Sequence, residues 1–242
     1  MPTILGKEVG QIGYGLMSKF LSISSYRENP FSYQIYAGFG RPGAPKVEEA
    51  VEVLKAALES GMTLWNGAEF YGTPESNSMT LLNAYFSKYP EDAGKVIISI
   101  KGGLDLSTRQ PTGSPDAVRQ SLDNVLQQLG GKKKLDLFSL GRRDPNYPFD
   151  ATLQIIQKEY VDTGKIGGIA LSECSVATVQ EAAKNVKIHL AELELSMFTP
   201  DILTNGIAAA CAEHDITVIA YSPIGRGVSV ARDFLWQTQT NF

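Results

Sequence analysis

The segment "VEEAVEVLKAALESGMTLWNGAEFYG" (residues 47–72) shows how this 242-residue chain is organised. Its first part places apolar residues three and four positions apart, from Val47 to Leu58, which predicts an amphipathic helix that stops at Gly61. The apolar run that follows is short and ends at Trp65, as expected of a buried strand, and the polar stretch "NGAEFYG" comes directly after it. The segment therefore predicts the helix, strand and polar loop of a parallel α/β fold.

The same alternation continues along the chain. The predicted strands are short, turn-bounded and rich in β-branched or aromatic residues, and they cover residues 12–17, 61–65, 96–101, 135–140, 166–172, 188–196 and 216–222. The predicted helices have apolar residues at helical spacing, and they cover residues 47–61, 75–85, 114–131, 148–163, 175–185 and 201–214. A helix thus follows each of the first six strands.

These βα units predict a (β/α)8 barrel of the TIM type. The sequence lacks the GxGxxG turn that would indicate a dinucleotide-binding sheet instead. We expect one domain over residues 1–242. Two regions do not fit a regular barrel. Residues 18–45 form an atypically long loop insertion, and residues 228–242 form a divergent tail. The residues after Ser222 are too few for an eighth unit, so we expect an incomplete barrel with seven βα strands.

Composition excludes several function classes. The net charge is −4, and the one basic run, Lys132 to Lys134, is interpreted as a solvated turn, so no nucleic-acid partner is expected. No apolar run reaches the roughly 18 residues of a membrane span, and the first ten residues are too charged for a secretory signal. Cys174 and Cys211 lie far apart without a metal-binding pattern. We expect a cytoplasmic protein without a membrane partner or a metal.

Two polar residues at predicted strand ends suggest chemistry. Tyr71 lies in the loop after the second strand, and Lys101 ends the third, so both belong to the carboxyl-terminal face where barrel enzymes place their sites. Lys101 could simply mark the solvated end of a strand. Beside a tyrosine, however, its ammonium would lower the phenol pKa and make Tyr71 a better proton donor to an alkoxide forming at a carbonyl.

The stretches "NGAEFYG", "IKGG" and "IAYSPIGRG" resemble the tyrosine loop, the lysine strand and the seventh strand of the aldo-keto reductases. "GKEVGQIGYGLM", "LSECSVATV" and residues 191–227 are similar to the fungal pyridoxal reductase branch of that family. The resemblance implies NADPH-dependent reduction of an aldehyde or ketone, such as pyridoxal, to an alcohol. It implies that Tyr71 is the general acid, that Lys101 activates it, and that Asn66 occupies the position of a third catalytic residue.

The resemblance also implies a set of residues around NADPH. Ser172 and Glu173 would hold the carboxamide with help from Glu192, and Tyr221 would stack on the nicotinamide. The remaining implied cofactor contacts come from the first strand and from the loop after the seventh, and they are Gly15, Met17, Ser222, Ile224 and Arg226.

The chain departs from the family pattern at three places. Asn66 replaces an aspartate that pairs with the lysine, and Gly141 replaces a catalytic histidine. Arg142 or Arg143 could supply the missing donor, although a solvated salt bridge is the simpler expectation for each. The tail resembles nothing in the family and lacks its grip on the cofactor 2′-phosphate. The alternative hypothesis is therefore a truncated, catalytically idle barrel that acts as a binding or interaction module.

Overall fold

The computed structural model describes residues 2–17 and 46–225, so the 18–45 insertion, the 228–242 tail and Arg226 lie outside the described residues. Seven parallel strands form one sheet in the order of the sequence. Its strands are β3 (Tyr14–Gly15), β4 (Leu64–Ala68), β5 (Ile97–Gly102), β6 (Leu135–Leu140), β7 (Ile166–Ser172), β8 (Ile188–Glu194) and β9 (Thr217–Tyr221). A small antiparallel sheet pairs β1 (Thr3–Ile4) with β2 (Lys7–Glu8).

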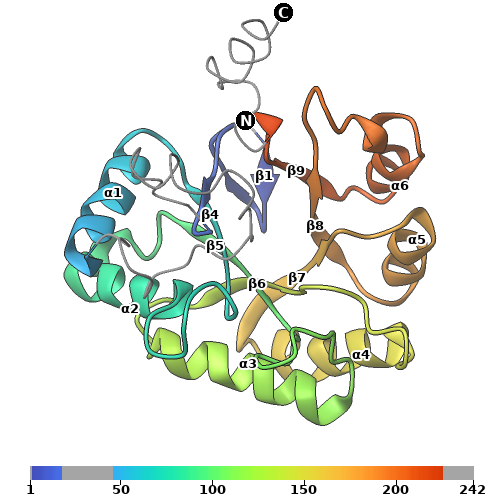
Figure 1. Ribbon diagram of the computed structural model, residues 1–242, viewed down its shortest axis with the longest axis horizontal. Helices are drawn as coiled ribbons and strands as arrows, with labels where there is room; N and C mark the ends of the chain where they lie inside the picture. Colours follow the sequence, from blue (N-terminus) through green and yellow to red (C-terminus); the bar gives the residue numbers. More distant parts are fainter. Residues whose placement is uncertain (1, 18–45, 226–242) are drawn as a thin grey trace, which may run out of the picture.

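Helices connect the parallel strands. They are α1 (Val47–Glu59), α2 (Ser78–Lys88), α3 (Pro115–Leu129), α4 (Phe149–Ile156), α5 (Val176–Asn185) and α6 (Ile207–Glu213). Short 3-10 helices form η1 (Pro90–Asp92) and η3 (Asp201–Leu203), and a π-helix, η2 (Gln157–Val161), continues α4. Figure 1 shows the sheet curled on itself with the helices on its outer side. The predicted fold class is confirmed: the described residues form a curled, parallel seven-stranded sheet, an incomplete (β/α)8 barrel with β3 and β9 at its edges.

The β1–β2 hairpin forms the floor of the curled sheet. Its residues Ile4 and Val9 are buried against the first inward-facing side chains of the sheet strands. Those side chains include Leu64, Ile97 and Leu137. The sequence analysis missed this hairpin, because two-residue strands are too short to show an apolar–polar alternation.

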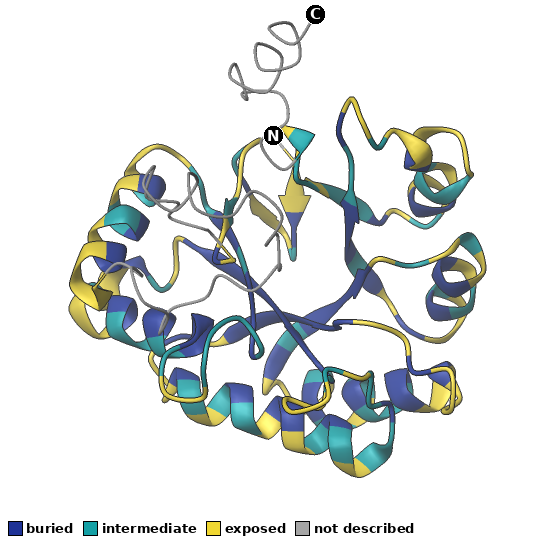
Figure 2. Cartoon of the chain, in the orientation of Figure 1, coloured by how far each residue is buried: buried dark blue, intermediate teal, exposed yellow. Residues whose placement is uncertain are grey.

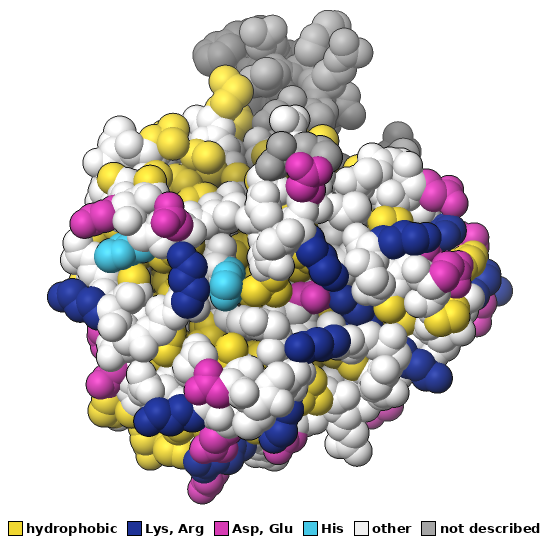
Figure 3. Space-filling model, turned by 180° about the vertical axis from the view of Figure 1, so that it is seen from behind, with side chains coloured by type: hydrophobic (Ala, Val, Ile, Leu, Met, Phe, Trp, Pro, Cys, Tyr) yellow, Lys and Arg dark blue, Asp and Glu magenta, His cyan; other side chains and the backbone are white. Residues whose placement is uncertain are grey.

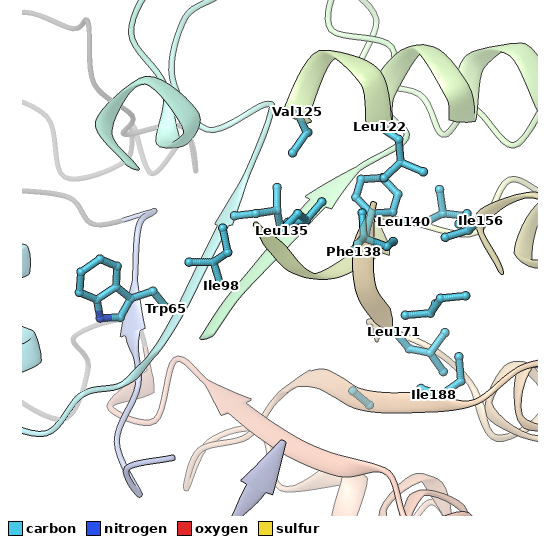
Figure 4. Close-up of a cluster of buried hydrophobic side chains, with 14 of the residues drawn as sticks. Trp65, Ile98, Leu122, Val125, Leu135, Phe138, Leu140, Ile156, Leu171 and Ile188 are labelled. Atoms are coloured by element: carbon cyan, nitrogen blue, oxygen red, sulfur yellow. The ribbon is translucent and has the colours of Figure 1, made fainter. Parts of the chain in front are cut away.

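The main core lies between the sheet and the helices. Trp65 is fully buried and meets Tyr85 of α2 edge-on, with 4.9 Å between the ring centroids. Ile98 and Phe138 belong to the same cluster, and Figure 4 shows them between the strands and the helices. Burial is concentrated on the strands and on the inward sides of the helices (Figure 2). The outer core therefore fixes the strands from which the site is built.

Several predicted boundaries were wrong for local reasons. The first strand is only Tyr14–Gly15 instead of residues 12–17. The helix expected from residue 75 begins at Ser78, because Asn77 accepts hydrogen bonds from the amides of the first turn and forms a capping box. The helix expected over residues 201–214 is split into the turn η3 and the helix α6, with Gly206 in a left-handed conformation between them.

The interpretation of the basic run as solvated was wrong for one lysine. Lys133 is buried and pairs with the Asp136 carboxylate at 2.6 Å. That carboxylate also accepts a hydrogen bond from the Ile98 amide. On the face drawn in Figure 3, basic and acidic side chains are interspersed instead of forming a basic patch.

The described part of the chain lacks two kinds of feature. None of its helices is long and apolar enough to cross a membrane. None of its histidine, cysteine, aspartate and glutamate side chains form a group of three that could hold a metal ion.

We expect Phe138→Ala to lower the free energy of unfolding by about 3–5 kcal/mol, because it opens a cavity in the outer core. The matched control is Leu106→Ala, since Leu106 is 45% exposed and Phe138 is fully buried. The control should change stability by less than about 0.5 kcal/mol. Urea unfolding measures both, and equal losses for the two variants would contradict the assignment of Phe138 to the core.

Candidate active site

A layer of polar side chains lies directly above the apolar floor. Side chains alternate across a strand, so the residue two positions after each floor residue faces the same interior. In β4, β5, β6, β7 and β8 that step leads from an apolar to a polar residue. The polar residues reached in this way are Asn66, Ser99, Ser139, Ser172 and Glu192, and Lys101 follows Ser99 on β5. The carboxyl-terminal end of the sheet is therefore lined with hydrogen-bonding groups.

Lys101 and Glu192 form an ion pair across the interior of the sheet. The Lys101 Nζ lies 2.8 Å and 2.9 Å from the two carboxylate oxygens of Glu192. The side chains are only 4% and 9% exposed, so water screens the pair little. The Asn66 amide donates a hydrogen bond to Oε2 of the same carboxylate. Burial lowers the pKa of the Lys101 ammonium, and the charge of Glu192 opposes that shift.

Tyr71 lies beside this pair, in the loop between β4 and α2. The Lys101 Nζ is 5.2 Å from the centroid of the Tyr71 ring, so the structure brings the two residues together. Within residues 2–17 and 46–225, the Tyr71 hydroxyl has no hydrogen-bond partner. No acceptor in that part of the chain therefore competes with a ligand oxygen for its proton.

The expected direction of the Tyr71 pKa was wrong. Burial raises the pKa of the phenol, and the negative charge of Glu192 raises it further, while Arg142 opposes both. The main reason is that burial disfavours the charged phenolate, and the Glu192 carboxylate beside Lys101 adds to that effect. Without a bound ligand, Tyr71 is thus a protonated phenol throughout the neutral pH range.

Glu69 braces the Tyr71 loop, a role that the sequence analysis did not assign. Its backbone amide donates to the Lys101 carbonyl oxygen, at 2.9 Å. Its buried carboxylate accepts hydrogen bonds from the Gly103 amide and from the Ser121 hydroxyl of α3, at 3.1 Å and 2.6 Å. Burial raises the pKa of this carboxyl group. The residue ties the tyrosine loop to the lysine strand, and its position between Asn66 and Tyr71 was the available signal.

Phe70 fills the space beside Gly141, where the resemblance placed a missing histidine. A Cβ atom at Gly141 would lie only 2.9 Å from Cζ of Phe70. The same ring packs edge-on against Tyr71, with 5.2 Å between centroids. The absence of a histidine at position 141 is therefore matched by an aromatic ring in the volume that its side chain would need.

The two neighbouring arginines differ in their surroundings. Arg143 forms a surface ion pair with Glu181 at 2.6 Å, as the simpler expectation had it. Arg142 instead donates to the Gly141 carbonyl oxygen, and its charge acts on the pKa values of Tyr71 and Lys101. Arg142 is thus a second positive charge near Tyr71, besides Lys101.

Three expected cofactor contacts line β7 and β9. Ser172 is buried, and its hydroxyl has no hydrogen-bond partner within the described part of the chain. Glu173 accepts a hydrogen bond from the Glu194 amide at 2.9 Å. Burial raises the pKa of the Tyr221 phenol, and the Glu173 carboxylate raises it further, so the two side chains lie close together at the ends of β7 and β9.

The other expected contacts lie at the two edges of the sheet. Gly15 pairs with Asn66, and the Asn66 side chain would lie 4.0 Å from a Cβ atom there. Met17 and Ile224 are exposed on the loops after β3 and β9. Ser222 has a left-handed backbone, with φ of 54°. The structure places these residues near the strand ends without joining them to the ion pair.

We expect Gly141→His to lower the free energy of unfolding by about 1–3 kcal/mol, because the new side chain overpacks against Phe70. The same substitution in a Phe70→Ala background should cost less, since the ring no longer occupies the space. Gly94→His is the control, because no atom of the described residues lies within 4 Å of a Cβ atom at Gly94. Urea unfolding of the four variants measures the coupling, and fully additive losses would contradict this packing.

Comparisons with known proteins show which family the chain belongs to. The sequence model of the aldo/keto reductase family matches residues 36–233. The chain is 38% identical to the "Probable pyridoxal reductase 2" of Schizosaccharomyces pombe, over 96% of this chain and 64% of that protein. It is 35% identical to the "Putative pyridoxal reductase" of Saccharomyces cerevisiae, over 89% of this chain and 60% of that protein. The chain thus spans less than two thirds of the length of these relatives.

The fold has a counterpart among solved structures. A thermostable aldo-keto reductase, solved with the inhibitor epalrestat, superposes with a TM-score of 0.69 at 23% identity, covering 96% of this chain and 77% of that one. At this identity the likeness concerns the fold. The family match extends over most of the sequence, and the chain belongs to the aldo/keto reductase family.

Proposed function

We propose that this barrel end reduces an aldehyde or ketone of the pyridoxal type to an alcohol, with NADPH as the hydride donor and Tyr71 as the general acid. One observation carries the proposal. The Tyr71 ring centroid lies 5.2 Å from the Lys101 Nζ, above a buried polar layer, and the protonated Tyr71 hydroxyl has no hydrogen-bond partner within residues 2–17 and 46–225. The pyridoxal-type substrate rests on the names of two relatives, "Probable pyridoxal reductase 2" and "Putative pyridoxal reductase".

The residues of this chain divide the proton chemistry among them. Tyr71 donates its hydroxyl proton to the carbonyl oxygen as negative charge develops there. The positive charges of Lys101 and Arg142 favour the phenolate that is left behind. Burial of the polar layer keeps competing water away and strengthens these interactions. The raised pKa of Tyr71 guarantees that the proton is present when a substrate arrives.

The side chains along β7 and β9 fit a nicotinamide cofactor. The Ser172 hydroxyl is unpaired within residues 2–17 and 46–225, so it can hydrogen-bond an amide group. The Tyr221 ring, close to the Glu173 carboxylate, offers an aromatic face at the end of β9. Bound there, the cofactor would supply the hydride. A relative from Schizosaccharomyces pombe, at 30% identity, is named an NADP(+) aldo-keto reductase, which supports the choice of NADPH.

A second candidate function is a binding module without turnover. The raised pKa of Tyr71 favours it, because a phenol of high pKa is a weaker acid than the proposed mechanism would prefer. The two candidates differ in one result, the oxidation of NADPH in the presence of pyridoxal. A binding module would quench or shift nicotinamide fluorescence on titration and would leave NADPH unoxidised in the presence of pyridoxal.

We expect Tyr71→Phe to lower kcat for NADPH-dependent pyridoxal reduction by about 10²- to 10⁴-fold, the usual contribution of general acid catalysis. The matched control is Tyr89→Phe, because Tyr89 hydrogen-bonds Glu52 on the exposed surface of the helix layer. The control should keep the activity of the parent chain. The loss of nicotinamide absorbance measures both rates, and a Tyr71→Phe variant with full turnover would assign the acid role to another group.

A further inference from the structure

We propose that Glu192 is a positioning residue: it keeps the Lys101 side chain protonated and in position for the proton transfer assigned to Tyr71. The inference rests on the proposed function for its catalytic meaning. Residue 66 on β4 is an asparagine in this chain and cannot give Lys101 a negatively charged partner. The proposal assigns that partner to Glu192 on β8. Glu192 is then part of the acid machinery instead of a ligand for the cofactor carboxamide.

The contacts of Glu192 fit this role. Oε1 faces the Lys101 Nζ at 2.8 Å, and Oε2 is shared between that Nζ and the Asn66 amide. A glutamine at position 192 could offer only one acceptor oxygen, and it would turn an amide nitrogen toward another donor. Lys101 and Asn66 thus account for three interactions of the Glu192 carboxylate.

Asn66 and Glu192 form a matched pair. An amide at position 66 can donate to the carboxylate at 192, as the structure shows. A carboxylate at position 66 would instead face a second carboxylate at hydrogen-bonding distance, and two such groups do not both ionise readily. The two positions therefore carry one negative charge between them. An aspartate at position 66 with a glutamine at position 192 would keep that charge beside Lys101.

The groups facing Lys101 show what Glu192 contributes. Tyr71 faces it from the loop after β4 as a neutral phenol, and Arg142 acts on it from the loop after β6 as a cation. Burial and Arg142 both lower the pKa of Lys101, and Glu192 alone among the groups that act on it in residues 2–17 and 46–225 raises it. Removal of Glu192 would leave a buried ammonium beside another cation, so the ammonium would lose its proton at lower pH.

The test compares three variants of the ligand-free chain: Glu192→Gln, the exchange Asn66→Asp with Glu192→Gln, and Glu181→Gln. Glu181 also pairs with a cation, Arg143, but at the surface. NMR of the chain labelled with ¹⁵N-lysine reports the pKa of each ammonium, and Lys101→Arg identifies the Lys101 signal by its loss. The NMR measurement needs no turnover, so it tests Glu192 independently of the proposed function.

We expect Glu192→Gln to lower the proton affinity of Lys101 at least about tenfold, which is one pKa unit. The exchange variant should recover most of that loss, and Glu181→Gln should not shift the Lys101 signal. With pyridoxal and NADPH, the high-pH limb of the kcat profile should move to lower pH in Glu192→Gln and return in the exchange variant. A merely structural role would lower kcat without moving that limb.

Each outcome has a distinct meaning. An unchanged Lys101 pKa in Glu192→Gln overturns the role of Glu192, whatever the activity. If Glu192→Gln does not fold, the same measurement on Glu192→Met provides the reading. A Lys101 pKa that is lower by at least about one unit supports the role, and an unchanged Lys101 pKa overturns it. A parent chain that does not oxidise NADPH overturns the proposed function and leaves the Lys101 measurement standing.

Discussion

The ion pair between Lys101 and Glu192 is the interaction on which the rest of the site depends. It joins β5 to β8, which are separated by two strands in the sheet order, and it does so through the interior. A buried ammonium or carboxylate without its partner lowers the stability of the fold by several kcal/mol, so each residue offsets the burial cost of the other. The hydrogen bond from Asn66 adds β4 to the same contact. One carboxylate thereby connects three strands at the end of the sheet where Tyr71 lies.

The pair is possible because the interior of the sheet has an apolar layer below a polar layer. The hairpin and the first inward residues of the strands make an apolar floor, and the next inward residues are polar. The low-dielectric floor excludes water from below and strengthens the interactions above it. The outer core, with Trp65 and Phe138, holds the strands against their helices. The chemistry is therefore confined to one end of the sheet by the period-two pattern of its strands.

Much of this arrangement could be predicted from the sequence. Apolar runs separated by helical segments predicted the parallel order of the strands, and the strand ends brought Tyr71 and Lys101 to one face. The contact between Lys101 and Glu192 could not be predicted in this way, because it depends on how tightly the sheet curls. Phe70 beside Gly141 was also missed, since a loop side chain has no period that shows where it packs. Lys133 lies in a basic run that looks solvated, and only the neighbouring strand shows its buried partner.

A double-mutant cycle on Lys101 and Glu192 tests the central claim most directly. Urea unfolding would compare the parent chain with Lys101→Met, Glu192→Gln and the combination of the two. We predict that each single substitution is strongly destabilising and that the combined variant loses much less than the sum, with a coupling of about 1–3 kcal/mol. Losses that add within about 0.5 kcal/mol would contradict the account, because they would mean that the two charges do not depend on each other.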